Sequence, residues 1–141
     1  MKRVIMYTQD NIQVRPLGTP QNIESHSAAI SQAAVRLAKQ MSATAIIAET
    51  KTGTTTHNIA AHRPIRPIIS VTSDPRVAQQ LALIYANKSF LRPDGEKAGL
   101  ELAKQLVQQG YLAAPSTFVL VSGRQPGVQG ATDTIRVRTI E

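Results

Sequence analysis

The sequence has no cysteine and no tryptophan, and it has only three tyrosines and two phenylalanines. The lack of cysteine excludes a disulfide framework, a thiolate metal site, an iron–sulfur cluster and a cysteine nucleophile. It is also typical of cytoplasmic proteins, so we expect that location. Proteins that bind single-stranded nucleic acid stack bases on several aromatic side chains in a basic groove. With so few aromatic residues, the sequence does not favour a nucleic-acid partner.

Long hydrophobic runs and acidic residues are also scarce. No apolar stretch approaches the roughly 20 residues that a membrane span needs, and polar residues at positions 8–10 interrupt the segment where a secretory signal would be apolar. We therefore expect no membrane partner. Nine acidic residues stand against 16 lysines and arginines, a formal charge of +7. This charge favours an anionic partner, and the scattered basic residues favour a phosphorylated metabolite over nucleic acid.

No residues show the spacing of a catalytic or metal-binding constellation. His57 and His62 are five residues apart, which does not place them on one helix face as a metal pair requires. No two carboxylates lie near enough in sequence to suggest an acid–base pair. The sequence therefore predicts no catalytic residue, no metal and no resident cofactor.

The 141 residues are enough for one compact domain. Apolar residues recur along them in two patterns. Three- and four-residue spacing indicates helices, and short apolar runs indicate buried strands. Helices are expected over residues 22–41, from the loop at 50–56 to His62, from Asp74 onward and from Asp94, as an N-cap, to Gln109. Strands are expected at residues 43–48, 68–71, 89–91, 117–121 and 135–140.

The alternation of these elements predicts a mostly parallel sheet with helices on both faces. Residues 135–140 follow the previous strand without a helix, so this strand should be antiparallel at the sheet edge. Weak alternation in residues 1–15 predicts a hairpin, and the prolines and glycine that follow predict a linker. The sequence thus predicts a three-layer α/β/α sandwich of about five strands at residues 22–141, after an extension and linker at residues 1–21.

The strongest local signal is the segment TKTGTTT at residues 50–56, between a buried strand and a helix. Ligands of open α/β sheets bind at the carboxyl ends of the strands. A helix N-terminus offers free N–H donors and a partial positive charge that suit phosphate. Gly53 permits close backbone approach, and threonine hydroxyls and Lys51 add donors. The alternative is that the threonines only cap the helix and the glycine only makes a turn; the pattern alone leaves both open.

A second glycine-rich segment, at residues 123–134, also leaves the carboxyl end of a strand. It could face residues 50–56 across a shared site. Taken alone, it is more simply explained as a crossover into the edge strand.

Three motifs in order resemble the C-terminal regulatory domain of pyruvate kinase: ETKTGTTT, then RPIRPIISVTSDPRVAQQLAL, then SGRQPGVQGATDTIRV. The family's first loop typically reads Thr-Glu/Lys-Ser-Gly-Arg/Thr, and a late segment reads Pro-Gly-x-x-Gly-x-Thr-Asn-Thr. The resemblance covers roughly residues 23–140. It implies a helix–sheet sandwich whose first loop grips a phosphate of a sugar phosphate or nucleotide.

The resemblance also assigns residues to that phosphate site. The cradle would be formed by Thr50, Lys51, Thr52, Gly53 and Thr55, with Arg124, Gly127 and Gly130 from the closing loop. Thr54 also lies in the cradle, where many members carry an arginine. A phosphate, sulfate or sugar phosphate is the ligand expected there.

The family keeps its catalytic groups on a separate barrel domain of more than about 200 residues, which does not fit in this chain. The resemblance therefore implies a non-catalytic binding and regulatory domain, either stand-alone or excised from a longer kinase; the initial methionine favours the stand-alone form. A rival hypothesis is an assembly module. Family domains pack across a two-fold axis, and an exposed edge strand at residues 135–140 could pair in a homodimer or higher homo-oligomer.

Overall fold

The computed structural model describes residues 1–12, 26–123 and 132–141. Within them, ten elements follow one another in the order α1 (Lys2–Asn11), α2 (His26–Gln40), β1 (Ala45–Glu49), α3 (Thr54–Ala61), β2 (Ile68–Thr72), α4 (Pro75–Leu81), β3 (Asn87–Leu91), α5 (Ala98–Gln108), β4 (Ser116–Gly123) and β5 (Thr132–Ile140). From residue 26 onward, the expected order of helices and strands is confirmed. None of the described helices combines the length and the apolar character that crossing a membrane requires.

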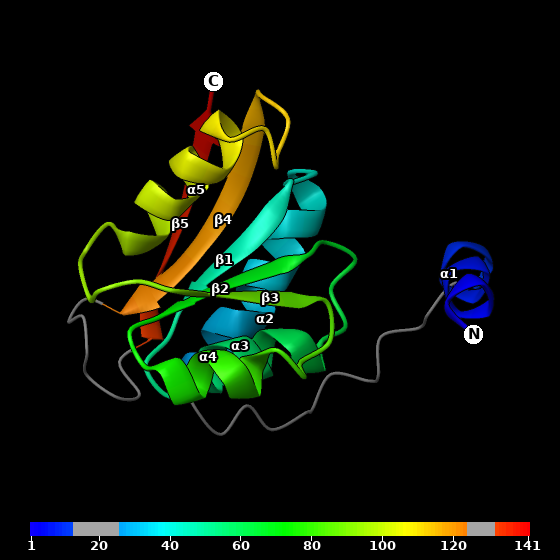
Figure 1. Ribbon diagram of the computed structural model, residues 1–141, viewed down its shortest axis with the longest axis horizontal. Helices are drawn as coiled ribbons and strands as arrows, with labels where there is room; N and C mark the ends of the chain where they lie inside the picture. The colour runs from blue at the N-terminus through cyan, green and yellow to red at the C-terminus, as the bar shows by residue number, and fades with distance from the viewer. Residues whose placement is uncertain (13–25, 124–131) are drawn as a thin grey trace.

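The five strands form one sheet in the order β3-β2-β1-β4-β5 (Figure 1). The pairs β3–β2, β2–β1 and β1–β4 are parallel, and β5 pairs antiparallel with β4. The chain proceeds outward from β1 to β3, then crosses back to β4 on the other side of β1. The expected mostly parallel sheet with an antiparallel C-terminal edge is confirmed, and the strand order reverses between β1 and β4.

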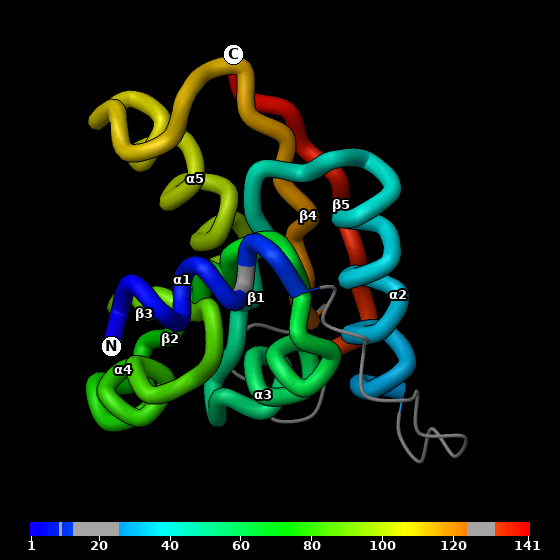
Figure 2. Tube along the Cα trace, turned by 90° about the vertical axis from the view of Figure 1, so that its right-hand side faces the viewer, coloured from blue at the N-terminus to red at the C-terminus, as the bar shows by residue number. Residues whose placement is uncertain are grey.

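Two apolar layers lie on opposite faces of the sheet, as the side-to-side separation of α2 and α5 in Figure 2 shows. Alternate residues of the strands face the two layers, because side chains in a strand point to opposite faces. One layer packs α2 and α3 against the sheet through Ala34, Ala38, Ile46, Ile59 and Val119. The other packs α5 against it through Ile47, Leu102, Ala103, Leu106 and Phe118. The three-layer α/β/α sandwich is therefore confirmed.

Local sequence signals set two helix ends as expected. The Asp74 carboxylate accepts hydrogen bonds from the backbone N–H groups of Arg76 (2.8 Å) and Val77 (3.4 Å), and Pro75 opens α4. Such a cap stabilises a helix by about 0.5–2 kcal/mol. Gly110 follows α5 with a left-handed φ of +75°.

The hairpin expected in residues 1–15 is wrong, because residues 2–11 form the helix α1. The alternation was weak because Val4, Ile5 and Met6 are consecutive apolar residues, a run that a helix accommodates as well as a strand. The described residues of α1 are exposed, and the helix stands apart from the sheet in Figure 1. Residues 13–25, which include the expected linker and the expected start of the next helix, lie outside the described residues.

The N-cap expected at Asp94 is also wrong. The helix α5 begins at Ala98, and Lys97 stands at its N-cap without a capping side-chain bond of its own. Asp94 instead faces Lys51, on the loop after β1. The sequence signal misled because Gly95 and Glu96 extend the loop past Asp94. The carboxylate that accepts from the first turn of α5 is instead that of Glu49, at the end of β1.

Candidate functional site

The candidate site lies at the edge of the sheet where the parallel strands β1, β2 and β3 end. Three loops leave this edge: residues 50–53 after β1, residues 73–74 after β2 and residues 92–97 after β3. Ligands of open α/β sheets bind at this edge, near the point where strand order reverses. Here that point is the boundary between β1 and β4.

Gly53 makes the turn from the loop into α3. It occupies the N-cap of α3 with a φ of +87°, a backbone conformation that favours glycine. Its N–H donates to Thr50 Oγ1 over 2.9 Å. A Cβ at this position would lie 3.2 Å from Leu81 Cδ2 on α4. The turn therefore requires glycine both for its φ and for its close approach to α4.

The threonines that follow divide into exposed and buried residues. Thr52 and Thr54 are exposed, and their hydroxyl oxygens lie 2.9 Å apart. Gly53, at the N-cap of α3, has no side chain that could cap the helix, and the Thr50 hydroxyl accepts from its N–H at the turn. Thr55 is buried, and its hydroxyl lies 2.7 Å from that of Thr132 at the start of β5. Thr55 thus ties the loop to the edge strand rather than facing solvent.

Lys51 brings a positive charge to the same loop. Its Nζ lies 3.6 Å from Asp94 Oδ2 on the loop after β3, and both side chains are nearly half exposed. An ion pair this exposed contributes little to stability, about 0–1 kcal/mol. The ion pair holds the Lys51 ammonium beside the threonine loop. Because the pair is weak, a ligand could separate Lys51 from Asp94 at little energetic cost.

Glu49, the last residue of β1, is a site residue that the sequence reasoning missed. Its Oε1 accepts a 2.8 Å hydrogen bond from the N–H of Gly99, in the first turn of α5. Burial raises the pKa of the Glu49 carboxyl above its ordinary 4.5, while the Gly99 N–H and the positive charge of Arg136 act in the opposite direction. An acidic residue ending an apolar strand was the signal available in the sequence.

Replacing Glu49 by glutamine should change how stability depends on pH. Because the pKa of Glu49 is raised in the folded protein, folding favours the protonated form. The contribution of this group to stability is therefore greatest below pH 4.5 and falls as pH rises from 4.5 through the raised pKa. Glu49→Gln keeps an acceptor for Gly99 and removes this loss. In urea titrations, the variant should gain stability relative to the parent between acid and neutral pH; a difference that stays constant with pH would contradict this assignment.

Thr50, Lys51, Thr52, Gly53 and Thr54 lie together at the start of α3, whereas Thr55 is buried against Thr132. Their role in binding phosphate stays a prediction. Arg124, Gly127 and Gly130, expected from the closing loop, lie outside the described residues. Within the described ranges, no three histidine, aspartate or glutamate side chains are grouped in a way that would hold a metal ion.

Residues 28–138 match the family model described as the pyruvate kinase alpha/beta domain. The chain belongs to this family. The match covers the helices and strands from α2 to β5 and includes the loop after β1. The resemblance of the three sequence motifs to pyruvate kinase is thereby confirmed.

Curated relatives of the chain are named pyruvate kinase. One from Agrobacterium vitis is 32% identical over 97% of this chain and 30% of its own length. Pyruvate kinase 2 from Synechocystis is 33% identical over 80% of this chain and 20% of its own length. A pyruvate kinase from Mycobacterium intracellulare is 30% identical over 99% of this chain and 30% of its own length. The chain thus spans less than a third of the relatives that it matches.

Proposed function

We propose that the loop after β1 binds the phosphate group of a phosphorylated metabolite, and that the domain is a regulatory domain of the pyruvate kinase kind. The observation that carries this proposal is the start of α3. Gly53 turns the chain there with a left-handed φ and, as a glycine N-cap, has no side chain to bond the N–H groups of the first helical turn. Among the residues that the structure describes, no side chain bonds these N–H groups, so they can donate to an anion.

The side chains around this helix start suit a phosphate ligand. The N-terminus of a helix carries a partial positive charge, and its free N–H groups point along the axis toward an anion. The exposed hydroxyls of Thr52 and Thr54 add two donors on the same turn. Lys51 adds a charge that a doubly charged phosphate attracts more strongly than a single carboxylate does, so a ligand can displace Asp94 from it.

We also propose that the chain does not catalyse phosphoryl transfer by itself. Such transfer depends on metal ions and on residues that hold them beside the moving phosphate. The chain matches at most about a third of each full pyruvate kinase, and the family resemblance assigns those groups to the barrel domain. We also propose that the protein is located in the cytoplasm.

The double variant Thr52→Ala/Thr54→Ala tests the phosphate site. If both hydroxyls donate to a charged oxygen, their loss should weaken binding of inorganic phosphate by about 1–3 kcal/mol, measured by isothermal titration calorimetry. Thr117 and Thr139 provide a matched control, because their hydroxyls form a similar exposed pair, 3.1 Å apart, on β4 and β5. Thr117→Ala/Thr139→Ala should leave the affinity unchanged. Equal affinities for both double variants would show that Thr52 and Thr54 do not contact the ligand.

Assembly through β5 is a second candidate function. This nine-residue strand pairs with β4 on one side, and no other described strand pairs with its outer edge. Ile135 and Val137 pack into one core layer and Ile140 into the other, while Arg136 and Arg138 are exposed. Free N–H and C=O groups along an edge favour pairing with a second copy around a two-fold axis.

We expect the protein to be a dimer of about 30 kDa, twice the 15.2 kDa of one chain. Residues 2–11 form the helix α1, so they offer no strand that could cover the outer edge of β5 within one chain. Light scattering during size-exclusion chromatography over a concentration series measures the mass. A monomer throughout that series would exclude assembly through β5.

A further inference from the structure

Large apolar side chains are exposed at two main places in the described part of the chain. Six of the twelve lie on residues 1–12, which include α1. Five of the other six lie on the loops that lead into β1, β2, β3 and β4. Because these four strands are parallel, their first residues share one edge of the sheet, opposite the edge of the candidate site. These five residues form the amino-edge patch: Met41, Ile65, Leu83, Tyr85 and Tyr111.

The centre of the amino-edge patch is built by the loops before β2 and β3. Ile65 and Leu83 on these loops are 80% and 90% exposed. The N–H of Ile68 donates to the carbonyl of Ala86 over 2.8 Å, which joins the two loops. The Arg63 guanidinium lies 4.6 Å from the centre of the Tyr85 ring and joins them a second time. The two loops therefore present their apolar side chains on one preformed surface.

The helix α1 has an apolar side and stands apart from the sheet (Figure 1). Val4 and Ile5 follow Met1 by three and four residues, so these side chains share one side of the helix. Met6 follows Arg3 by three residues and lies on the other side. A helix of 10 residues is marginal in water by itself, because most helix stability in proteins comes from packing an apolar side. The helix α1 therefore needs an apolar surface to pack on.

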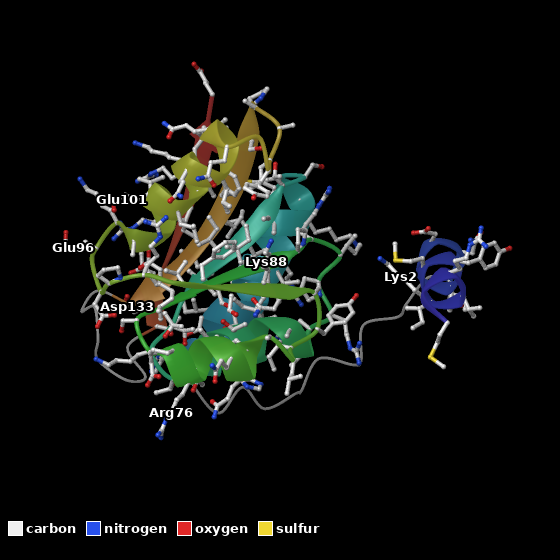
Figure 3. All side chains as sticks on the ribbon, viewed as in Figure 1. Lys2, Arg76, Lys88, Glu96, Glu101 and Asp133 are labelled. Carbon is white, nitrogen blue, oxygen red and sulfur yellow. The ribbon has the colours of Figure 1, made fainter. Side chains whose placement is uncertain are left out.

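The amino-edge patch lies within reach of α1. In Figure 3, Lys2 of α1 is on the opposite side of the molecule from Glu96 and Glu101, which lie near the other edge of the sheet. Residues 12–25 join α1 to α2, and 14 residues span at most about 45 Å. The helix α2, which leads toward the amino edge, is only about 22 Å long. The connection is therefore long enough to bring α1 from the start of α2 to the patch.

The charges of α1 and of the patch are complementary at one end of the helix. Arg63 and Arg66 flank Ile65, and residues 50–73 contain no aspartate or glutamate that could pair with them. Asp10 lies in the last turn of α1, where the helix end also carries a partial negative charge. The two cations of α1, Lys2 and Arg3, lie at its other end. The charges thus favour one orientation, with the end of α1 toward the two arginines of the patch.

We propose that α1 docks on the amino-edge patch of its own chain. Val4 and Ile5 pack against Ile65 and Leu83, and Asp10 faces the arginines beside them. The docked helix removes two exposed apolar surfaces from water at once, which is the main driving force for such a contact. It covers the beginnings of β2 and β3 and leaves the opposite edge of the sheet open.

Paramagnetic broadening of NMR signals tests the contact on the full chain. The chain has no cysteine, so Arg3→Cys carries a single nitroxide label, on the side of α1 away from the contact. Compared with the reduced label, the nitroxide should broaden the amide signals of Ile65 and Leu83. The signals of Gly53 and Gly99, at the opposite edge of the sheet, should keep their intensity. Unchanged signals at Ile65 and Leu83 would overturn the proposal.

Two aspartate variants in the labelled chain test which side of α1 makes the contact. The side chains of Ile5 and Met6 are 50% and 49% exposed, so they form a matched pair. Ile5→Asp places a carboxylate in the contact and should shift the docking equilibrium toward the free helix by about tenfold or more, with loss of the broadening. Met6→Asp should leave the broadening as it is. Equal broadening in the two variants would overturn the assigned contact.

A mixed sample separates docking within one chain from docking on a second copy. It combines spin-labelled chains that lack ¹⁵N with ¹⁵N-labelled chains that lack the spin label. Docking within one chain predicts no broadening at Ile65 and Leu83 in this sample. Broadening there would show that α1 covers the patch of a second copy and would overturn the proposal.

Discussion

Phe118→Ala is expected to lower the free energy of unfolding by about 3–5 kcal/mol, the cost of removing a buried ring and leaving a cavity. Phe118 has the largest of the fully buried side chains among the described residues. It lies on β4, next to β1 in the sheet. It packs against Leu102 and Leu106 of α5. Because α5 packs against β1, β4 and β5, this change should loosen that helix. Urea unfolding followed by circular dichroism measures the loss.

Phe118→Leu is the matched control, because it keeps an apolar side chain of similar volume. It should cost less than about 1.5 kcal/mol. Equal losses for the two variants would mean that the α5 layer is not the tightly packed core described above.

Gly53→Ala should destabilise the protein by about 1–3 kcal/mol and weaken phosphate binding. The added Cβ meets a φ of +87° and lies 3.2 Å from Leu81 Cδ2, so the turn into α3 must shift. Any such shift moves the N–H groups that we assign to the phosphate. Both effects are measured on one protein, by urea unfolding and by calorimetry with inorganic phosphate.

Gly110 supplies the control for backbone strain. Its φ is +75°, and a Cβ there would have no heavy atom within 4 Å. Gly110→Ala should therefore destabilise the protein through strain alone and leave phosphate affinity unchanged. If Gly53→Ala binds phosphate as the parent does, the turn at Gly53 is not part of the binding site.

The fold from residue 26 onward could be predicted because local signals and burial agree there. Residues 45–48 of β1 and 118–121 of β4 are short apolar runs, and strands buried on both faces have this composition. Asp74-Pro75 specifies a helix start whichever tertiary contacts follow. In α1, no tertiary packing selects a face among the described residues, so alternation and helical spacing were both compatible with the sequence.

Only the part of the candidate site that is formed by neighbouring residues in the sequence was predictable. The cradle residues from Thr50 to Thr54 are consecutive, and the strand–glycine–helix pattern places them at one turn. The contacts of Thr55 with Thr132 and of Glu49 with Gly99 join residues 77 and 50 positions apart. Such partners depend on strand order and on how closely α5 approaches β1, which no local pattern specifies. Gly99 permits that approach, since a Cβ there would lie 2.7 Å from Glu49 Oε1.

Binding of phosphate at the start of α3 can be observed residue by residue in an NMR titration of the ¹⁵N-labelled chain with inorganic phosphate. We expect saturable shifts of the amide signals of Gly53, Thr54 and Thr55, with the signal of Gly110 unchanged. Absence of shifts at Gly53–Thr55, or shifts spread evenly over the basic surface without saturation, would contradict it.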